Sequence, residues 1–142
     1  MNLRVLLGTL SIIDISNKTL LNKLIYYIST YIKTNSLEQE VFYEWLVYSN
    51  VKEEKLLLLL KSIINCNSIS TLTNQDLIVE LSYYLHSNNP ELVRLLVILF
   101  CTTNNKEIIR LQLHSLSDRG KEFNIEVIKK TLNIFLPDHF LF

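Results

Sequence analysis

The chain has 142 residues, of which 49% are hydrophobic and 20% are charged, a balance that excludes an intrinsically disordered protein. Its 14 basic and 14 acidic side chains cancel, so the protein has no global field to attract nucleic acid or an anionic membrane. Two glycines and two prolines are too few for the turns of an all-β domain, and they favour long helices with short connections.

The first segment of the chain, residues 2–13, is an apolar run that begins near Arg4 and is closed by Asp14. No A-x-A cleavage pattern follows it, so we interpret it as a core helix rather than a signal peptide. The uncharged apolar run at 56–60 is far too short to span a membrane. We therefore expect an intracellular protein, cytoplasmic or nuclear, that makes no use of a membrane.

Helical periodicity follows in the next two segments, residues 19–33 and 37–49. Each carries an apolar stripe at the spacing of one helix face, which predicts the buried side of an amphipathic helix. The first stripe consists of Leu20, Leu24, Tyr27, Ile28 and Tyr31, and the second of Leu37, Val41, Trp45 and Tyr48.

Further helical patterns bring the expected total to about seven or eight helices in an all-α fold. Start signals precede three of these helices. Asn74, Asn89 and Asn105 stand where a capping side chain is favoured, and Pro90 occupies a first helical position. The patterns cover residues 51–64, 75–86, 90–103, 106–117 and 124–136.

A repeat appears when the segment "PELVRLLVILF", residues 90–100, is compared with the rest of the chain. Moving it forward by 35 residues lays it on "IEVIKKTLNIF" and sets Arg94 on Lys129. Moving it back by 39 residues sets Arg94 on Lys55 and Leu99 on Leu60. Each of these helices follows an amphipathic helix and a short polar turn, so the repeated unit is a helical hairpin.

The segment "LIVELSYYLHSNNPELVRLLVILF", residues 77–100, resembles the HEAT repeat family in its Pro90 and in the "ELVR" that follows. Residues 106–136 resemble a second unit without the proline, and residues 37–64 resemble a looser third. The two segments 2–13 and 18–34 would form an atypical fourth unit. The chain departs from the family's pattern in the turn, where Asn88 or Asn89 replaces the usual aspartate, so an Asp–Arg ladder between units is not expected.

This resemblance implies a stack of antiparallel helical hairpins, a HEAT-like right-handed α-solenoid. It would form a single domain over residues 1–142, or a piece of a longer repeat array. Hairpins of this kind stack because one hairpin alone cannot bury both of its apolar faces. A closed, irregular helical bundle is the alternative architecture.

Neither the histidines nor the glycines form a recognisable chemical motif. His86, His114 and His139 are scattered, without the spacing of metal ligands, and no nucleophile motif occurs. Gly8 and Gly120 cannot build a glycine-rich phosphate loop. We therefore expect no catalytic residue, no metal site and no cofactor, and the protein is not expected to be an enzyme.

The two cysteines, Cys66 and Cys101, stand alone without a CxxC motif. We expect them to be buried thiols in a reducing compartment. The sequence leaves a disulfide between them open.

The first candidate for partner binding is the row of cations Lys55, Arg94 and Lys129, which the repeat places at equivalent positions. In a stack these positions would line up along one edge, as a basic ladder for an acidic peptide or a phosphate backbone. The structural alternative is that each cation pairs with an acidic side chain in the adjacent turn.

The second candidate is the tail after Pro137, where Phe140, Leu141 and Phe142 end the chain. An apolar end of a repeat array needs cover, either on its own core or from another unit or chain. Phe140 and Phe142 are therefore candidate partner-binding residues. We expect the isolated chain either to self-associate, most simply as a homodimer, or to need a partner's helices for its solubility.

The function expected from these features is that of a non-enzymatic scaffold or adaptor that binds another protein or peptide through a helical-repeat surface. One alternative is a nucleic-acid-associated helical repeat protein, which the neutral net charge disfavours. Another is a small regulatory helical bundle similar to Bcl-2-like or death-domain proteins.

Overall fold

A computed structural model describes residues 2–32, 36–66, 69 and 71–135 of the chain. Over these residues all regular structure is helical, which confirms the predicted all-α class and helix number. None of the helices formed by these residues is long and apolar enough to cross a membrane. The elements are α1 (Leu3–Ile12), α2 (Lys18–Tyr31), α3 (Ser36–Tyr48), α4 (Glu53–Asn65), α5 (Gln75–Tyr83), the 3-10 turn η1 (Tyr84–His86), α6 (Pro90–Thr102), α7 (Glu107–Asp118) and α8 (Glu122–Phe135).

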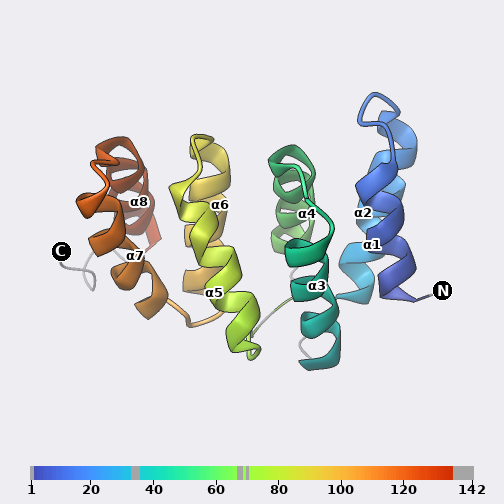
Figure 1. Ribbon diagram of the computed structural model, residues 1–142, viewed down its shortest axis with the longest axis horizontal. Helices are drawn as coiled ribbons and strands as arrows, with labels where there is room; N and C mark the ends of the chain where they lie inside the picture. Colours follow the sequence, from blue (N-terminus) through green and yellow to red (C-terminus); the bar gives the residue numbers. More distant parts are fainter. Residues whose placement is uncertain (1, 33–35, 67–68, 70, 136–142) are drawn as a thin grey trace. The chain divides into compact units, whose positions relative to one another are not determined.

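The chain forms two compact units, Met1–Glu80 and Leu81–Phe142, with the boundary inside α5. In the first unit α1 packs against α2 and α3, and α2 also packs against α4 (Figure 1). The first helices of its two hairpins are thus neighbours, and so are the second helices. Aliphatic side chains dominate the core between them: Leu3, Leu6, Leu7, Leu10, Leu21, Leu24, Ile25, Ile28, Leu56, Leu59, Leu60 and Ile63.

The buried face of α2 differs from the predicted stripe. Leu24 and Ile28 are buried as expected, but Leu20, Tyr27 and Tyr31 are exposed, with Tyr27 at 55%. The core is reached by an aliphatic set that shares Leu24 and Ile28 with this stripe: Leu21, Leu24, Ile25, Ile28 and Ile32. Tyrosine keeps its hydroxyl in water at little cost, so the helix turns its aliphatic side inward.

The stripe predicted for α3 is correct in its centre and wrong at its ends. Val41 and Trp45 are buried, whereas Leu37 and Tyr48 are exposed. The buried Gln39 ties this helix to the segment before α5, because its Oε1 accepts hydrogen bonds from the backbone N–H groups of Thr73 (2.9 Å) and Asn74 (3.0 Å).

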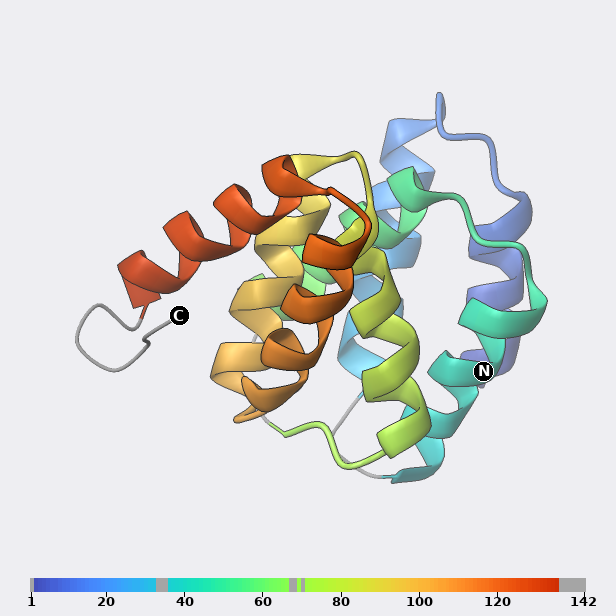
Figure 2. The ribbon, with the colours of Figure 1, turned by 60° about the vertical axis from the view of Figure 1, so that its left-hand side comes forward.

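In the second unit α6 is the central helix and contacts η1, α7 and α8 (Figure 2). It is buried on most of its sides, and Leu99 and Phe100 belong to the core. Its buried residues are Leu92, Val93, Leu95, Leu96, Val97, Ile98, Leu99 and Phe100.

Two of the three predicted helix caps are present. Asn89 Oδ1 accepts from the backbone N–H of Glu91 (3.0 Å), with Pro90 at the first helical position, and Asn74 Oδ1 accepts from Leu77 N–H (3.0 Å). The prediction for Asn105 is wrong. Its amide turns back and donates to the carbonyl oxygen of Thr103 (3.0 Å), and α7 begins two residues later without a side-chain cap.

Helices α6 and α7 end in the same way, each with a left-handed residue that reverses the chain. Asn104 has φ 61° and Gly120 has φ 69°. The next residue then donates back into the helix, from Asn105 N–H to the Phe100 oxygen (2.7 Å) and from Lys121 N–H to the Leu116 oxygen (2.9 Å). These bonds satisfy carbonyls that would otherwise lack partners, and they make the short connections that a helical hairpin requires.

Candidate functional site

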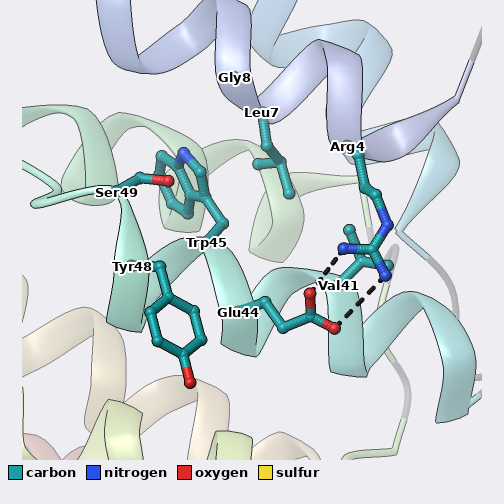
Figure 3. Close-up of a pocket in the computed structure, with 8 residues that line it drawn as sticks. All are labelled: Arg4, Leu7, Gly8, Val41, Glu44, Trp45, Tyr48 and Ser49. Atoms are coloured by element: carbon teal, nitrogen blue, oxygen red, sulfur yellow. Dashed lines mark hydrogen bonds and ion pairs between the residues drawn. The ribbon is translucent and has the colours of Figure 1, made fainter.

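A groove between α1 and α3, within the first unit, is the candidate site. We call it the α1–α3 groove; its cavity volume is about 230 Å³ (Figure 3). Its lining combines an apolar floor with a charged rim and is contributed by two helices: Arg4, Leu7 and Gly8 from α1, with Val41, Glu44, Trp45, Tyr48 and the adjoining Ser49 from α3.

The indole of Trp45 is fixed at the base of the groove. It is only 5% exposed, and its Nε1–H donates to Ser11 Oγ at 2.7 Å. The Ser11 hydroxyl in turn donates to the carbonyl oxygen of Leu7 at 3.2 Å. The ring of Phe42, on the same helix, packs against the indole with 6.0 Å between the two ring centroids. The tryptophan therefore presents a preorganised surface rather than a mobile one.

An ion pair closes one side of the groove. Arg4 binds Glu44 through two contacts, Nη1 to Oε2 at 2.6 Å and Nη2 to Oε1 at 3.3 Å, drawn as dashed lines in Figure 3. The hydrogen bond from Arg4 and its positive charge lower the pKa of the Glu44 carboxyl. The same bond, together with the charge of Glu44, raises the pKa of Arg4. The pair therefore stays ionised around neutral pH and links the two helices.

Open space lies above Gly8. A β-carbon built on this residue would meet no atom within 4 Å apart from its immediate surroundings in α1. On the facing helix Tyr48 is 79% exposed, while Leu7 reaches from α1 toward α3 (Figure 3). No side chain therefore covers the backbone of α1 at Gly8, and the exposed ring of Tyr48 belongs to the facing helix α3.

Lys55 occupies a different environment from that expected of a surface ladder. It is 7% exposed, and its Nζ donates to the carbonyl oxygens of Ser11 (3.0 Å) and Ile13 (2.8 Å) at the end of α1. Removal from water lowers the pKa of its ammonium group. The charge therefore satisfies the orphan carbonyls of a helix C-terminus inside the first unit.

The other two cations of the predicted row belong to the second unit. Arg94 Nη2 lies 3.8 Å from Glu91 Oε1, one turn earlier on α6, which is the structural alternative considered for this residue. Lys129 is half-buried on α8, and α6 and α8 pack together. Phe140 and Phe142 lie outside the described residues, so their role in partner binding stays a prediction.

Both cysteines are free thiols. Cys101 is half-buried, and burial raises its pKa, but Cys66 is exposed, so the expectation of burial is wrong for Cys66. Among the residues that the structure describes, no three His, Cys, Asp or Glu side chains come together as metal ligands.

Sequence reasoning did not single out Arg4, Gly8 or Glu44. Arg4 and Glu44 are 40 positions apart, so no local spacing connects them. A usable signal was present on α3, where two large aromatic residues, Trp45 and Tyr48, are three positions apart and an acidic residue, Glu44, precedes Trp45. The groove itself follows from the packing of α1 on α3.

No protein-family model, no curated protein and no solved structure matches this chain.

Proposed function

We propose that this chain is a non-enzymatic scaffold or adaptor, and that the α1–α3 groove binds one anchor side chain of a partner polypeptide. The observation that carries the proposal is the pairing of a fixed tryptophan with the bare floor at Gly8. Large aromatic residues and arginine dominate protein-binding hot spots, and Trp45, Tyr48 and Arg4 all line this groove.

The size of the groove favours a polypeptide over a cofactor. Small-molecule and cofactor pockets are typically roughly 300–1,000 Å³, whereas this groove measures about 230 Å³. A single large apolar side chain suits that space. The charged rim of Arg4 and Glu44 would then face the polar backbone and flanks of the bound segment.

Helix packing within the first unit supports the helical-repeat part of the proposal. The first helices of its two hairpins, α1 and α3, pack on each other, and so do the second helices, α2 and α4. Hairpins that stack in this way share one core and leave the same side of each hairpin as a surface. We therefore propose HEAT-like hairpins, as in a right-handed α-solenoid, with the groove between two successive first helices.

The test uses a side chain that fills the groove without disturbing the fold. Gly8→Leu adds bulk where a β-carbon has open space, and leucine is a better helix former than glycine. Thr9→Leu is the matched control, since Thr9 is exposed on the same helix and does not line the groove. Peptides selected from a random library on the wild-type chain are then titrated against both variants.

Trp45 gives a direct signal of occupancy because it is the only tryptophan of the chain. We expect groove-binding peptides to change its fluorescence, to lose at least tenfold in affinity for Gly8→Leu and to keep their affinity for Thr9→Leu. A tenfold loss corresponds to about 1.4 kcal/mol. Selected peptides that bind wild type and Gly8→Leu equally, without changing Trp45 emission, would overturn the proposal.

A further inference from the structure

The charged side chains of the first unit are unevenly divided between its helices. The first helices, α1 and α3, together with the start of α5 up to Glu80, carry one basic side chain and five acidic ones: Arg4, Glu38, Glu40, Glu44, Asp76 and Glu80. The second helices, α2 and α4, carry four basic side chains and two acidic ones: Lys18, Lys23, Lys55, Lys61, Glu53 and Glu54. The α1–α3 groove opens between two of the first helices, so its surroundings are acidic.

Two carboxylates follow each other along α3 beside the groove. Glu44 lines the groove, and Glu40 precedes it by four residues, a spacing that places both on the same side of the helix. The guanidinium of Arg4 is already matched, because it binds both carboxylate oxygens of Glu44 (Figure 3). Glu44 is the main cause of the raised pKa of Arg4, and the charge of Glu40, which is exposed, adds to it. Glu40 therefore lies near the groove as a negative charge in excess of this ion pair.

Two more carboxylates lie near α3, on the neighbouring helix α5. Asp76 and Glu80 are four residues apart, so they share one side of α5. Removal from water raises the pKa of the Tyr43 hydroxyl on α3, and Asp76, the groove residue Tyr48 and Glu80 raise it further. Within the described part of the chain, neither Asp76 nor Glu80 nor Glu40 forms an ion pair. The groove thus has an apolar base, and the unmatched charges around it have one sign.

We propose that the α1–α3 groove binds a basic segment of another protein, in which a large apolar anchor side chain has lysine or arginine on both sides. This inference rests on the proposed function of the groove and names the chemistry of the partner. The anchor lies against Trp45 and above Gly8, and the flanking cations face the carboxylates of Glu40 and of α5. Opposite charges around an apolar centre favour encounter and select the partner, whereas the same carboxylates repel an acidic segment or a nucleic-acid backbone.

The test compares two peptides that differ only in the charges beside the anchor. One has two lysines on each side of the anchor and the other has two glutamates, and both are made with leucine, isoleucine, phenylalanine or methionine as the anchor. Each is titrated into the full chain at low salt and followed by the fluorescence of Trp45. We expect the lysine peptides to bind at least about tenfold more tightly than the glutamate peptides, and added salt to reduce this difference. Tighter binding of the glutamate peptides, or no binding of any lysine peptide, overturns the inference.

Two single substitutions in the first unit separate a charge beside the groove from net charge. Glu40→Gln should weaken the lysine peptides about threefold, the scale of an exposed ion pair. Glu54→Gln is the matched control, since it removes an equal charge from an exposed position on α4, outside the lining of the groove, and should leave binding unchanged. Equal weakening in both variants would show an effect of net charge and contradict the inference. Circular dichroism checks that both variants are folded.

Gly8→Leu distinguishes failure of this inference from failure of the proposed function. We expect it to abolish the binding of the lysine peptides. Equal affinities of the lysine and glutamate peptides, both lost in Gly8→Leu, would leave the groove as a binding site and overturn only the basic partner. A preference for lysine that survives in Gly8→Leu would place the peptides outside the groove and overturn both. A wild-type dimer in sedimentation that Gly8→Leu dissociates would identify a second copy of the chain as the occupant, and would overturn the inference of a different protein.

Discussion

Helices α2 and α6 have nearly the same length but are packed in opposite ways. α6 contacts η1, α7 and α8 and buries eight of its residues, whereas α2 contacts α1 and α4 and buries five. The number of neighbours decides how much of a helix must be apolar. A helix at the centre of its unit has little surface left for polar residues, and on α6 that surface carries Glu91 and Arg94. A helix with fewer neighbours keeps a free side, and on α2 that side carries Leu20, Tyr27 and Tyr31.

The largest expected effect contrasts one side chain from each of these helices. Leu99 on α6 is 1% exposed, so Leu99→Ala leaves a cavity in the centre of the second unit and should lower the free energy of unfolding by about 2–5 kcal/mol. Tyr27→Ala on α2 removes a larger side chain that is mostly in water, and this variant should change the free energy of unfolding by less than about 0.5 kcal/mol. Urea denaturation of both variants measures the contrast.

A loss above about 2 kcal/mol for Tyr27→Ala would mean that the outer side of α2 is covered, and this contrast between the helices would fail. The edge-on contact between the rings of Tyr26 and Tyr27, with 6.3 Å between their centroids, is too weak to produce such a loss.

The helix ends and buried faces show where sequence reasoning succeeds and where it fails. The start of α6 was predictable because an asparagine cap and a proline at the first helical position act locally. The buried face of α2 was predicted wrongly because Tyr27 and Tyr31 were counted as apolar, although a tyrosine satisfies an apolar surface and water equally well. Asn105 failed as a cap because its amide had a competing acceptor in Thr103.

The candidate site was less accessible to sequence reasoning than the fold. Trp45 and Val41 belonged to a predicted stripe, but the groove exists only because α1 lies across α3 and brings Arg4 to Glu44. Likewise, nothing in the spacing of Ser82, His86 and Gln112 indicates their hydrogen-bonded chain, since long-range packing brings α7 against η1. Contacts of this range depend on tertiary geometry, which a single sequence does not encode as a pattern.

The second prediction compares the stability changes caused by substituting the two glycines, one in each unit. Gly120 has φ 69°, whereas Gly8 lies within helix α1, and at both positions a new β-carbon would meet no atom within 4 Å. Steric space is therefore equal and only the backbone conformation differs. Gly120→Ala should destabilise the protein by about 1–2 kcal/mol, the cost of a left-handed residue with a side chain. Gly8→Ala should stabilise it by up to about 1 kcal/mol.

Thermal and urea unfolding of the two glycine variants give the sign of each change directly. Shifts of the same sign for both variants would contradict the assignment of Gly120 to the turn that ends α7. The double variant should show the sum of the two effects, because the sites belong to different units and share no partner.

The third effect concerns the cap of α6. Asn89→Ala removes the acceptor of the Glu91 N–H bond and should lower the free energy of unfolding by about 1 kcal/mol. Asn88→Ala is the matched control, since Asn88 is the exposed neighbour and should change stability by less than about 0.5 kcal/mol. Asn89→Asp should restore most of the loss, because aspartate is an equally good cap. Losses of equal size at both positions would mean that the turn, rather than the cap, is what was disturbed.

The smallest expected effect is the pH dependence of the link between α1 and α3. The hydrogen bond and charge of Arg4 depress the pKa of Glu44 in the folded protein. A carboxyl with a depressed folded pKa binds fewer protons in the native state, so its contribution to stability is complete above the unfolded value, about 4.3 for glutamate. That contribution disappears as the pH falls through the lower, folded value. Comparing the unfolding midpoints of wild type and Glu44→Gln from pH 7 to pH 2 should therefore show a small difference at neutral pH that vanishes in acid. Arg4 is exposed and Glu44 is partly exposed, so added salt should reduce the difference at pH 7. If the difference between wild type and Glu44→Gln persisted at pH 2, Glu44 would be stabilising the groove by packing, and Arg4 would not be its essential partner.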